Sequence, residues 1–347
     1  QEDPGQTGLF WFVIEGELRK NTRKDYLLIF EEKEKENSRF AIDIDHEKLE
    51  IILDGNKVLR YRIAEKYPPE GTDPIYKRSA YIHPLWSPGG EILTNIQPES
   101  HLHHYGLWSP WTKTHIKDRE IDYWNLGKGE GTVKFAGMIN SFSGELFAGF
   151  STLHEHIDFG AKGPDRATML ETWKIRSWDT FSDRSERMID YHSNIYNNIA
   201  DTIIFNAYRY GGGLAFRATP EWNKETCTVL TSEGKTRENA DGERARWCIV
   251  EGASSVKEGR SGLLFLSHPF NYDHPEALRI WPKDAAGGTG ELMFDYCPAR
   301  LKDWIIEPGK NYQLNYRMIV YDGKMTKEKA EMYWNGFAYP PRVVLKK

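Results

Sequence analysis

The chain has 347 residues and a net charge of −5, which argues against nucleic-acid binding, because nucleic-acid-binding proteins present a basic face. No apolar run approaches the roughly 18 residues of a membrane-spanning helix, so the sequence predicts no membrane span. The three cysteines (Cys227, Cys248 and Cys297) show no CxxC spacing, so they favour buried free thiols, with at most one disulfide, over a zinc ribbon or a disulfide scaffold.

Strand-like segments dominate the chain from its beginning. Residues 1–45 combine apolar runs at 9–14 and 26–30 with a charged stretch at 31–36, and they predict a small N-terminal element packed on the main body. From residue 46 to 347, many strands joined by turns predict one all-β sandwich domain. Its first unit is a hairpin, because Asp54-Gly55 separates two apolar runs and is a strong turn signal.

Later segments continue the strand pattern. Apolar residues alternate or cluster in four further predicted strands, at 168–175, 188–196, 262–266 and 311–321. Helix is scarce, and the clearest candidate is 326–334 with Thr326 as its N-cap. Loops rich in Gly, Pro and His at 83–115 and 268–290 are expected to lie at strand ends and to build a site.

Three of the eleven histidines, His101, His103 and His104, lie within four residues. Imidazole can act as acid, base or metal ligand near neutral pH. In a strand His103 and His104 would point to opposite faces, so they can share a site only in a bend, which Gly106 can supply. His101 and His103 would share a face if the segment is extended. The alternative is a polar loop of solvated histidines.

Several ordered motifs resemble the bacterial PmoA-like family (DUF6807) from about residue 47 to 323. The segments that carry the resemblance are 81–90, 103–108, 210–217, 245–248 and 267–271. The resemblance implies a β-supersandwich similar to galactose mutarotase-like folds, which often act on carbohydrates. It also implies an exported protein of a glycan-degrading bacterium, periplasmic or secreted, and the start Gln1-Glu2-Asp3-Pro4 is consistent with a removed signal peptide.

Beside His104, three residues complete the predicted catalytic set. His268 precedes Pro269 after an apolar run, so it lies at a strand end, where it can catalyse or simply cap the strand. Arg217 ends a Gly-rich strand and can bind a carboxylate or sugar hydroxyls, or form a structural ion pair. Glu171 lies mid-strand, either outward and solvated, or inward with a raised pKa and a catalytic role.

The predicted substrate-binding residues combine histidines, arginines and tryptophans. Arg279 and Trp281 have i, i+2 spacing and can therefore share a face to cradle a ligand. His154 and His156 also have this spacing, but we interpret them as a polar strand face. The full predicted binding set is His83, His103, Trp108, Arg246, Arg279 and Trp281.

Three functions remain open from the sequence. The first is acid/base chemistry on a sugar or sugar acid (epimerase, lyase or hydrolase type), in which His104 and His268 exchange protons and Arg217 neutralises negative charge. The second is a divalent-metal enzyme, including an oxidative one, with ligands from His101, His103, His104 and His268. The third is a non-catalytic glycan-binding protein that uses Trp108 and Trp281. The oligomeric state is not indicated.

Overall fold

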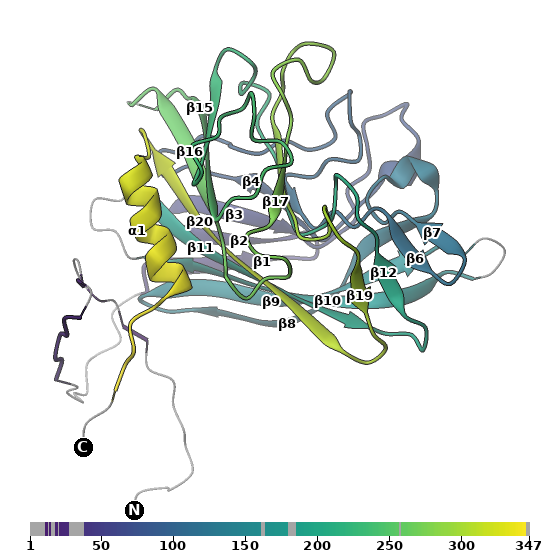
Figure 1. The fold of residues 1–347 in the computed structure, drawn as a ribbon, viewed down its shortest axis with the longest axis horizontal. Coiled ribbons are helices and arrows are strands. Elements are labelled where there is room, and N and C mark those ends of the chain that lie inside the picture. Colours follow the sequence, from purple (N-terminus) through teal and green to yellow (C-terminus); the bar gives the residue numbers. More distant parts are fainter. Residues whose placement is uncertain are drawn as a thin grey trace, which may run out of the picture.

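The computed structural model describes residues 11–12, 14, 18–19, 21–27, 38–160, 164–179, 185–256 and 258–344. Within these residues the chain forms three antiparallel sheets, and its one α-helix is α1 (Lys327–Ala338). The prediction of an all-β sandwich is confirmed (Figure 1). None of the described helices is long and apolar enough to cross a membrane.

The first sheet has eight strands and carries the candidate site. In spatial order its strands are β1 (Phe40–Ile44), β2 (Lys48–Leu53), β3 (Asn56–Arg62), β4 (Tyr81–Leu85), β5 (Leu107–Trp108), β13 (Leu214–Arg217), β18 (Met293–Cys297) and β17 (Ala277–Ile280). Neighbours in this sheet come from distant parts of the chain, since β5 pairs with β13 across more than 100 residues. The sheet therefore brings separate loops together at its surface.

The second sheet also has eight strands and packs against the first. In spatial order these are β14 (Cys227–Thr231), β15 (Trp247–Ala253), β16 (Arg260–Ser267), β20 (Asn311–Asp322), β11 (Glu186–Asn197), β10 (Arg166–Trp178), β9 (Phe147–Asp158) and β8 (Gly131–Ser143). A small sheet contains β19 (Trp304–Ile306), β12 (Ile203–Phe205), β6 (Thr114–Ile116) and β7 (Arg119–Ile121), and two short 3-10 turns are η1 (Pro74–Tyr76) and η2 (Leu126–Lys128).

The predicted local elements are confirmed where the structure describes them. The hairpin is β2–β3, and its two turn residues, Asp54 and Gly55, have φ of 50° and 76°, as a two-residue type I′ turn requires. The four later predicted strands correspond to β10, β11, β16 and β20. The predicted charged stretch 31–36 lies outside the described residues, and the 1–45 element stays a prediction, although its last strand, β1, pairs with β2.

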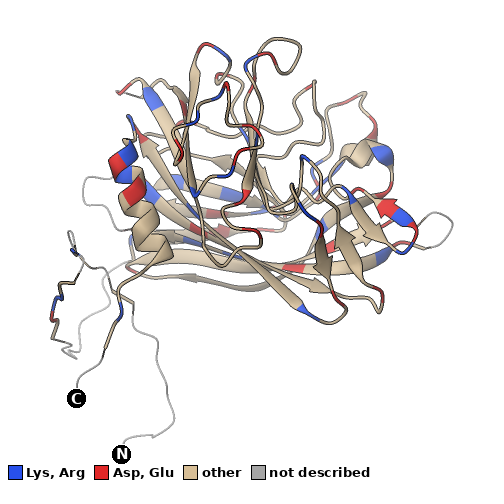
Figure 2. Ribbon diagram, in the orientation of Figure 1, with Lys and Arg blue, Asp and Glu red and all other residues tan. Residues whose placement is uncertain are grey.

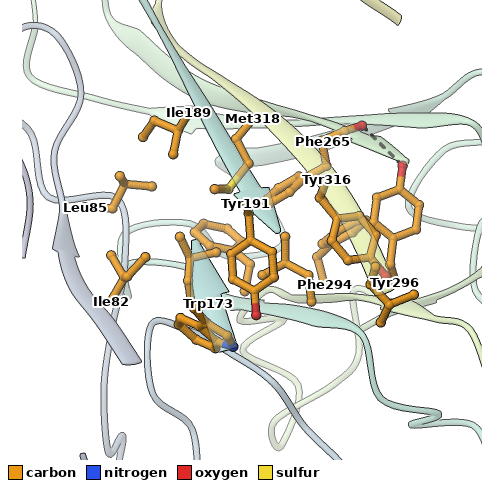
Figure 3. Packing of buried hydrophobic residues seen from close by; sticks show 14 of the residues in the cluster. Ile82, Leu85, Trp173, Ile189, Tyr191, Phe265, Phe294, Tyr296, Tyr316 and Met318 are labelled. Atoms are coloured by element: carbon orange, nitrogen blue, oxygen red, sulfur yellow. Dashed lines mark hydrogen bonds between the residues drawn. The ribbon is translucent and has the colours of Figure 1, made fainter. Parts of the chain in front are cut away.

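Aromatic side chains fill the space between the two large sheets. Trp173 and Tyr191 contact edge to face, with ring centroids 4.8 Å apart, and Phe265 stacks on Phe294 at 4.4 Å. The hydroxyl of Tyr296 donates a hydrogen bond to the carbonyl oxygen of Phe265 over 3.2 Å, which satisfies a polar group inside this core (Figure 3). The three cysteines are free and buried, as the sequence predicted.

The helix α1 covers the outer face of the second sheet. Its Trp334 and Phe337 pack against β15, β16 and β20, beside Leu264 and Ile319. The helix ends four residues beyond the predicted boundary. Figure 2 shows basic and acidic residues interspersed along the coloured ribbon rather than separated onto two faces.

Replacing the N-cap Thr326 with alanine is expected to lower the free energy of unfolding by about 1 kcal/mol. The Thr326 hydroxyl accepts a hydrogen bond from the backbone N–H of Lys329 over 3.2 Å, and alanine cannot replace this acceptor. Urea unfolding measures the loss, and Thr326→Ser is the control, because serine keeps the oxygen. Equal stability of the two variants would contradict the capping role.

A polar cluster lies inside the sandwich, and it corrects the interpretation of His154 and His156 as a polar strand face. Both histidines are fully buried and point between the sheets. The Nε2 of His154 lies 2.7 Å from the hydroxyl of Tyr61, and the Nε2 of His156 lies 2.9 Å from a carboxylate oxygen of Glu171. The cluster therefore belongs to the protein interior rather than to a solvated face.

Glu171 matches neither of the two alternatives expected from the sequence. Its carboxylate is fully buried, and it accepts hydrogen bonds from Trp173 Nε1 over 2.8 Å and from the Ser193 hydroxyl over 2.5 Å. Burial alone would raise the pKa of Glu171, but the hydrogen bond and charge of His156 outweigh burial and lower it to about 2. Glu171 is thus a buried, fully hydrogen-bonded carboxylate.

Acidification from pH 7.0 to 4.5 is expected to destabilise the protein, in part through His154. Burial lowers the pKa of His154 to about 3, against about 6.5 when unfolded. The unfolded chain therefore binds the extra proton first, and this contribution to stability is lost as the pH falls below 6.5. At pH 4.5 the loss from this side chain is about 2–3 kcal/mol.

Urea unfolding of the wild type and of His154→Gln at both pH values isolates this effect, because glutamine can still hydrogen-bond to Tyr61 but does not titrate. All other ionisable groups are common to the two proteins and cancel in the comparison. The variant should lose less stability on acidification than the wild type. An equal loss in both proteins would show that His154 does not carry this pH dependence.

Candidate functional site

The outer face of the first sheet carries the candidate site. Side chains alternate along a strand, and Leu107, Phe216 and Leu278 belong to the core between the sheets. Trp108 and Ala215 point the other way and join a second cluster on the outer face. The same alternation directs Arg217, Arg279 and Trp281 to this face, so three strands distant in sequence supply neighbouring side chains.

The three clustered histidines lie in the connection between β4 and β5, above this face. The backbone N–H of His104 donates to the carbonyl of His101 over 3.0 Å, which makes a tight turn rather than an extended segment. The turn brings the ring centroids of His101 and His104 to 5.0 Å and those of His103 and His104 to 4.9 Å. Gly106 follows with a positive φ of 61° and returns the chain to the sheet.

His104 is enclosed by indole rings. Its ring centroid lies 5.4 Å from those of both Trp108 and Trp124, and 5.3 Å from that of Trp281. The side chain is 1% exposed, and neither ring nitrogen has a hydrogen-bond partner in the described chain. Buried polar atoms are normally paired, so two unpaired nitrogens on one buried imidazole indicate a group available to a ligand or to water.

The histidines line a cavity of about 440 Å³, a volume typical of small-molecule sites. Trp124 and Tyr210 also line it, and sequence reasoning missed both. Tyr210 directly precedes Gly211-Gly212-Gly213 in one of the family motifs, which was an available signal, whereas Trp124 lies in no motif. The complete lining is His101, His103, His104, Thr112, Lys113, Glu120, Asp122, Trp124, Asn125, Lys128, Tyr208, Arg209 and Tyr210.

The three histidines are held in their neutral form at neutral pH. Burial, followed by the charges of His101 and Arg217, lowers the pKa of His103 to about 4. Burial, together with the charge of Arg217, also lowers the pKa of His101 and brings that of His104 well below the ordinary value. Neutral imidazoles in a cavity can accept protons or hydrogen bonds from a bound molecule.

Arg217, Arg279 and Trp281 lie next to the histidines and to Tyr210, although none of the three lines the cavity itself. The guanidinium of Arg217 lies 4.9 Å from the Trp281 ring and forms an ion pair with Glu291. Arg279 Nη1 lies 2.9 Å from a carboxylate oxygen of Asp241, and its Nη2 donates to the hydroxyl of Tyr210 over 3.2 Å. The structure therefore brings together seven of the predicted residues: His101, His103, His104, Trp108, Arg217, Arg279 and Trp281.

The other predicted site residues lie elsewhere. His268 follows β16 in the second sheet and contacts Phe270 and Phe337, with ring centroids 4.9 and 5.1 Å away. Arg246 binds Glu331 of α1 over 2.6 Å. Glu171 is in the core, as described above. His83 faces the same side of the sheet as Tyr81, but its Nδ1 lies 2.9 Å from the Thr94 hydroxyl, and it does not line the cavity.

The histidine arrangement also bears on the predicted metal alternative. Among the side chains that the structure describes, no group of three or more His, Cys, Asp or Glu is placed so that it could hold a metal ion. The candidate ligand His268 has its ring contacts with Phe270 and Phe337, in the second sheet and α1 region rather than at the histidine turn. The arrangement therefore does not fit a metal site that combines His268 with His101, His103 or His104.

The family model described as "Family of unknown function (DUF6807)" matches residues 48–335. The chain belongs to this family. The match includes every residue of the site named above, from the histidine turn to Glu291. A comparison with curated proteins finds no match.

The solved structures that match this chain have longer chains. A mutant heparan sulfate lyase HepC from Pedobacter heparinus is 8% identical, with a TM-score of 0.42, over 84% of this chain and 38% of the lyase. An α-galactosidase from Geobacillus stearothermophilus is 8% identical, with a TM-score of 0.34, over 82% of this chain and 40% of the galactosidase. A polysaccharide lyase is 10% identical, with a TM-score of 0.33, over 84% of this chain and 34% of the lyase. The chain thus spans two-fifths or less of each.

Proposed function

We propose that the protein is an exported, periplasmic or secreted enzyme that performs acid/base chemistry on a carbohydrate in the histidine cavity. The observation that carries the proposal is His104, a neutral imidazole that is buried among three indole rings with both ring nitrogens unpaired within the described residues. A neutral imidazole with both ring nitrogens free of structural hydrogen bonds suits proton transfer better than support of the fold.

The neighbouring residues have complementary roles in this proposal. His104 takes a proton from the bound sugar through one ring nitrogen and, as the imidazolium so formed, returns it to the sugar or its leaving group. His101 and His103, whose ring centroids lie within 5.0 Å of that of His104, stay neutral and hydrogen-bond to the ligand. Arg217 stabilises negative charge that develops on the ligand. Trp124 and Tyr210, in the cavity wall, can stack on the apolar C–H face of a sugar ring.

This assignment gives both proton transfers to His104 and leaves out His268 of the sequence-based hypothesis. The reaction class is proton transfer at a sugar, which includes epimerisation, mutarotation, elimination and hydrolysis. The cavity and the neutral histidines support each of these to the same degree. Carbohydrate as the ligand class rests on the aromatic wall and on the resemblance to galactose mutarotase-like proteins.

The test is turnover of a glycan panel in D₂O, followed by mass spectrometry and NMR of each product. We expect at least one glycan to be cleaved, epimerised or deuterated by the wild type and by His46→Gln, an exposed histidine outside the site, but not by His104→Gln. Binding of a glycan without any turnover would instead establish the non-catalytic glycan-binding alternative. Turnover retained in His104→Gln would refute the assigned role.

A further inference from the structure

Arg217 is a buried guanidinium that uses only part of its hydrogen-bonding capacity. The side chain is 1% exposed, and one of its terminal nitrogens, Nη2, donates to Glu291. Its Nε and Nη1 have no partner in the part of the chain that the structure describes. Buried donors are rarely left unpaired. Each edge of the guanidinium contains Nη2, which Glu291 occupies, so release of Glu291 would free a complete edge that matches the two oxygens of a planar anion.

Gly106 lies beside the backbone of Arg217 and packs closely against Ile82. The backbone N–H of Arg217 donates to the carbonyl of Gly106 over 2.8 Å, so glycine occupies the adjacent position on the neighbouring chain. A Cβ at Gly106 would lie 2.2 Å from the carbonyl oxygen of Ile82, and its φ is positive, so no other residue fits there. The charge of Arg217 acts on all three clustered histidines, His101, His103 and His104.

The charges around the cavity favour an acidic ligand. Lys113 and Arg209 line it and are exposed, and neither forms an ion pair with a described carboxylate. Lys128 is paired with Asp122 over 3.0 Å. The acidic side chain Glu120 also lines the cavity, with its nearest ion-pair contact at 3.9 Å to His115. Burial lowers the pKa of Arg217 to about 10, so this side chain stays a cation at neutral pH.

Glu291 already presents a carboxylate to Arg217. Its side chain is 25% exposed and also accepts a hydrogen bond from the Ser100 hydroxyl over 3.4 Å, whereas its main chain is held by the buried Arg237. Arg237 Nε donates to the carbonyl of Trp281 over 3.0 Å, and its Nη2 donates to the carbonyls of Gly290 and Glu291. The Glu291 side chain can therefore rotate toward solvent without any movement of the 281–291 loop.

We propose that the ligand carries a carboxylate, as a uronic acid does, and that this carboxylate binds Arg217 in place of the Glu291 side chain. The inference rests on the proposed function, because it takes the ligand to be a carbohydrate. Glu291 then acts as an internal competitor that pairs the buried cation until an acidic sugar displaces it. A neutral sugar has no carboxylate to pair with Arg217, so it cannot replace the Glu291 side chain.

The test compares binding of acidic oligosaccharides with binding of the same molecules after their carboxyl groups are reduced to primary alcohols. Oligogalacturonates and glucuronate-containing oligosaccharides serve as probes, with calorimetry as the readout. Wild type is expected to bind at least one acidic probe at least about tenfold more tightly than its reduced form, since hydrogen bonds between charged groups are the strong ones. Arg62→Gln, which removes an ion pair with Glu47 away from the site, is the control.

Two variants should change affinity in opposite directions. Arg217→Gln is expected to lose the preference for the acidic probe, and Glu291→Gln is expected to bind it several-fold more tightly, because the internal competitor is removed. A gain of affinity cannot result from misfolding, so Glu291→Gln keeps the test decisive even if Arg217→Gln is unstable. Weaker or unchanged binding by Glu291→Gln would overturn the competitor role.

Equal binding of acidic and reduced probes, or binding of neutral glycans alone, overturns the carboxylate inference. If such a neutral glycan is nevertheless turned over in a reaction that His104→Gln abolishes, the proposed function stands without the inference. If the wild type binds and converts no glycan, the proposed function fails, and the inference fails with it.

Discussion

Replacing His104 with alanine is expected to lower kcat/KM on the glycan substrate by about 10²- to 10⁴-fold, the range that a general acid or base contributes. His104 makes no side-chain hydrogen bond to the described protein, so its removal breaks no structural network. The imidazole lies among the indole rings of Trp108, Trp124 and Trp281, and these three can still pack against one another, so the variant should stay folded. Steady-state kinetics with a thermal unfolding control separates a catalytic loss from a loss of structure.

The pH dependence of the rate gives an independent check on the same residue. Because burial and Arg217 lower the pKa of His104 well below its ordinary value, the neutral base persists into mildly acidic solution. The wild-type rate should therefore fall only at a pH clearly below 6.5, and this acid limb should disappear in the residual activity of His104→Ala. A fall centred at an unshifted histidine value, or an unchanged limb in the variant, would contradict His104 as the base.

The largest expected effect on stability comes from Glu171→Ala, which should lower the free energy of unfolding by about 3–5 kcal/mol. Removing a buried acceptor leaves its donors unpaired, and here three groups hydrogen-bond to the carboxylate: His156, Trp173 and Ser193. Alanine would leave all three without an acceptor in a fully buried setting. Urea unfolding at pH 7 measures the loss.

Glu155→Ala is the matched control for that experiment, because Glu155 lies on the neighbouring strand β9 and points away from the core. A surface change of this kind should stay within about 0.5 kcal/mol. Glu171→Gln should be intermediate, since an amide oxygen can still accept from Trp173 or Ser193. A loss below 1 kcal/mol for Glu171→Ala would show that the cluster is not an essential part of the core.

Local features of the fold were predictable because their causes are local. Asp54-Gly55 specifies a tight turn through its two positive φ angles, and Thr326 caps a helix three residues from the N–H that it binds. The order of strands in the sheets was not predictable, because β5 pairs with β13 and β16 pairs with β20 through long-range packing. No sequence pattern shorter than the whole chain encodes these pairings.

The difference between local sequence signals and long-range packing also explains which residues of the candidate site were predicted. The histidine turn was found because its members adjoin in sequence, and Arg217 and Trp281 were found as single residues at strand ends. His268 was correctly expected at a strand end, yet its strand, β16, belongs to the second sheet, so it lies away from the histidine turn. Trp124 reaches His104 from a separate loop, and only the assembled structure brings the two together.

The inward direction of His154 and His156 could have been inferred. Ala148 and Phe150 belong to the apolar core, and a period of two carries the same face on to His154 and His156. The polar character of the two histidines hid this alternation, because buried polar residues are uncommon unless paired. Their partners, Tyr61 and Glu171, come from other strands and gave no local signal.

The position of β20 has a consequence for how the protein forms. This strand lies near the end of the chain, yet it is the central member that joins β16 to β11 in the second sheet. During synthesis the strands β8–β11 and β14–β16 therefore emerge as two separate groups with unpaired edges, which are templates for aggregation. The sheet closes only after residues 311–322 have left the ribosome, so we expect slow folding that depends on protection of those two edges until then.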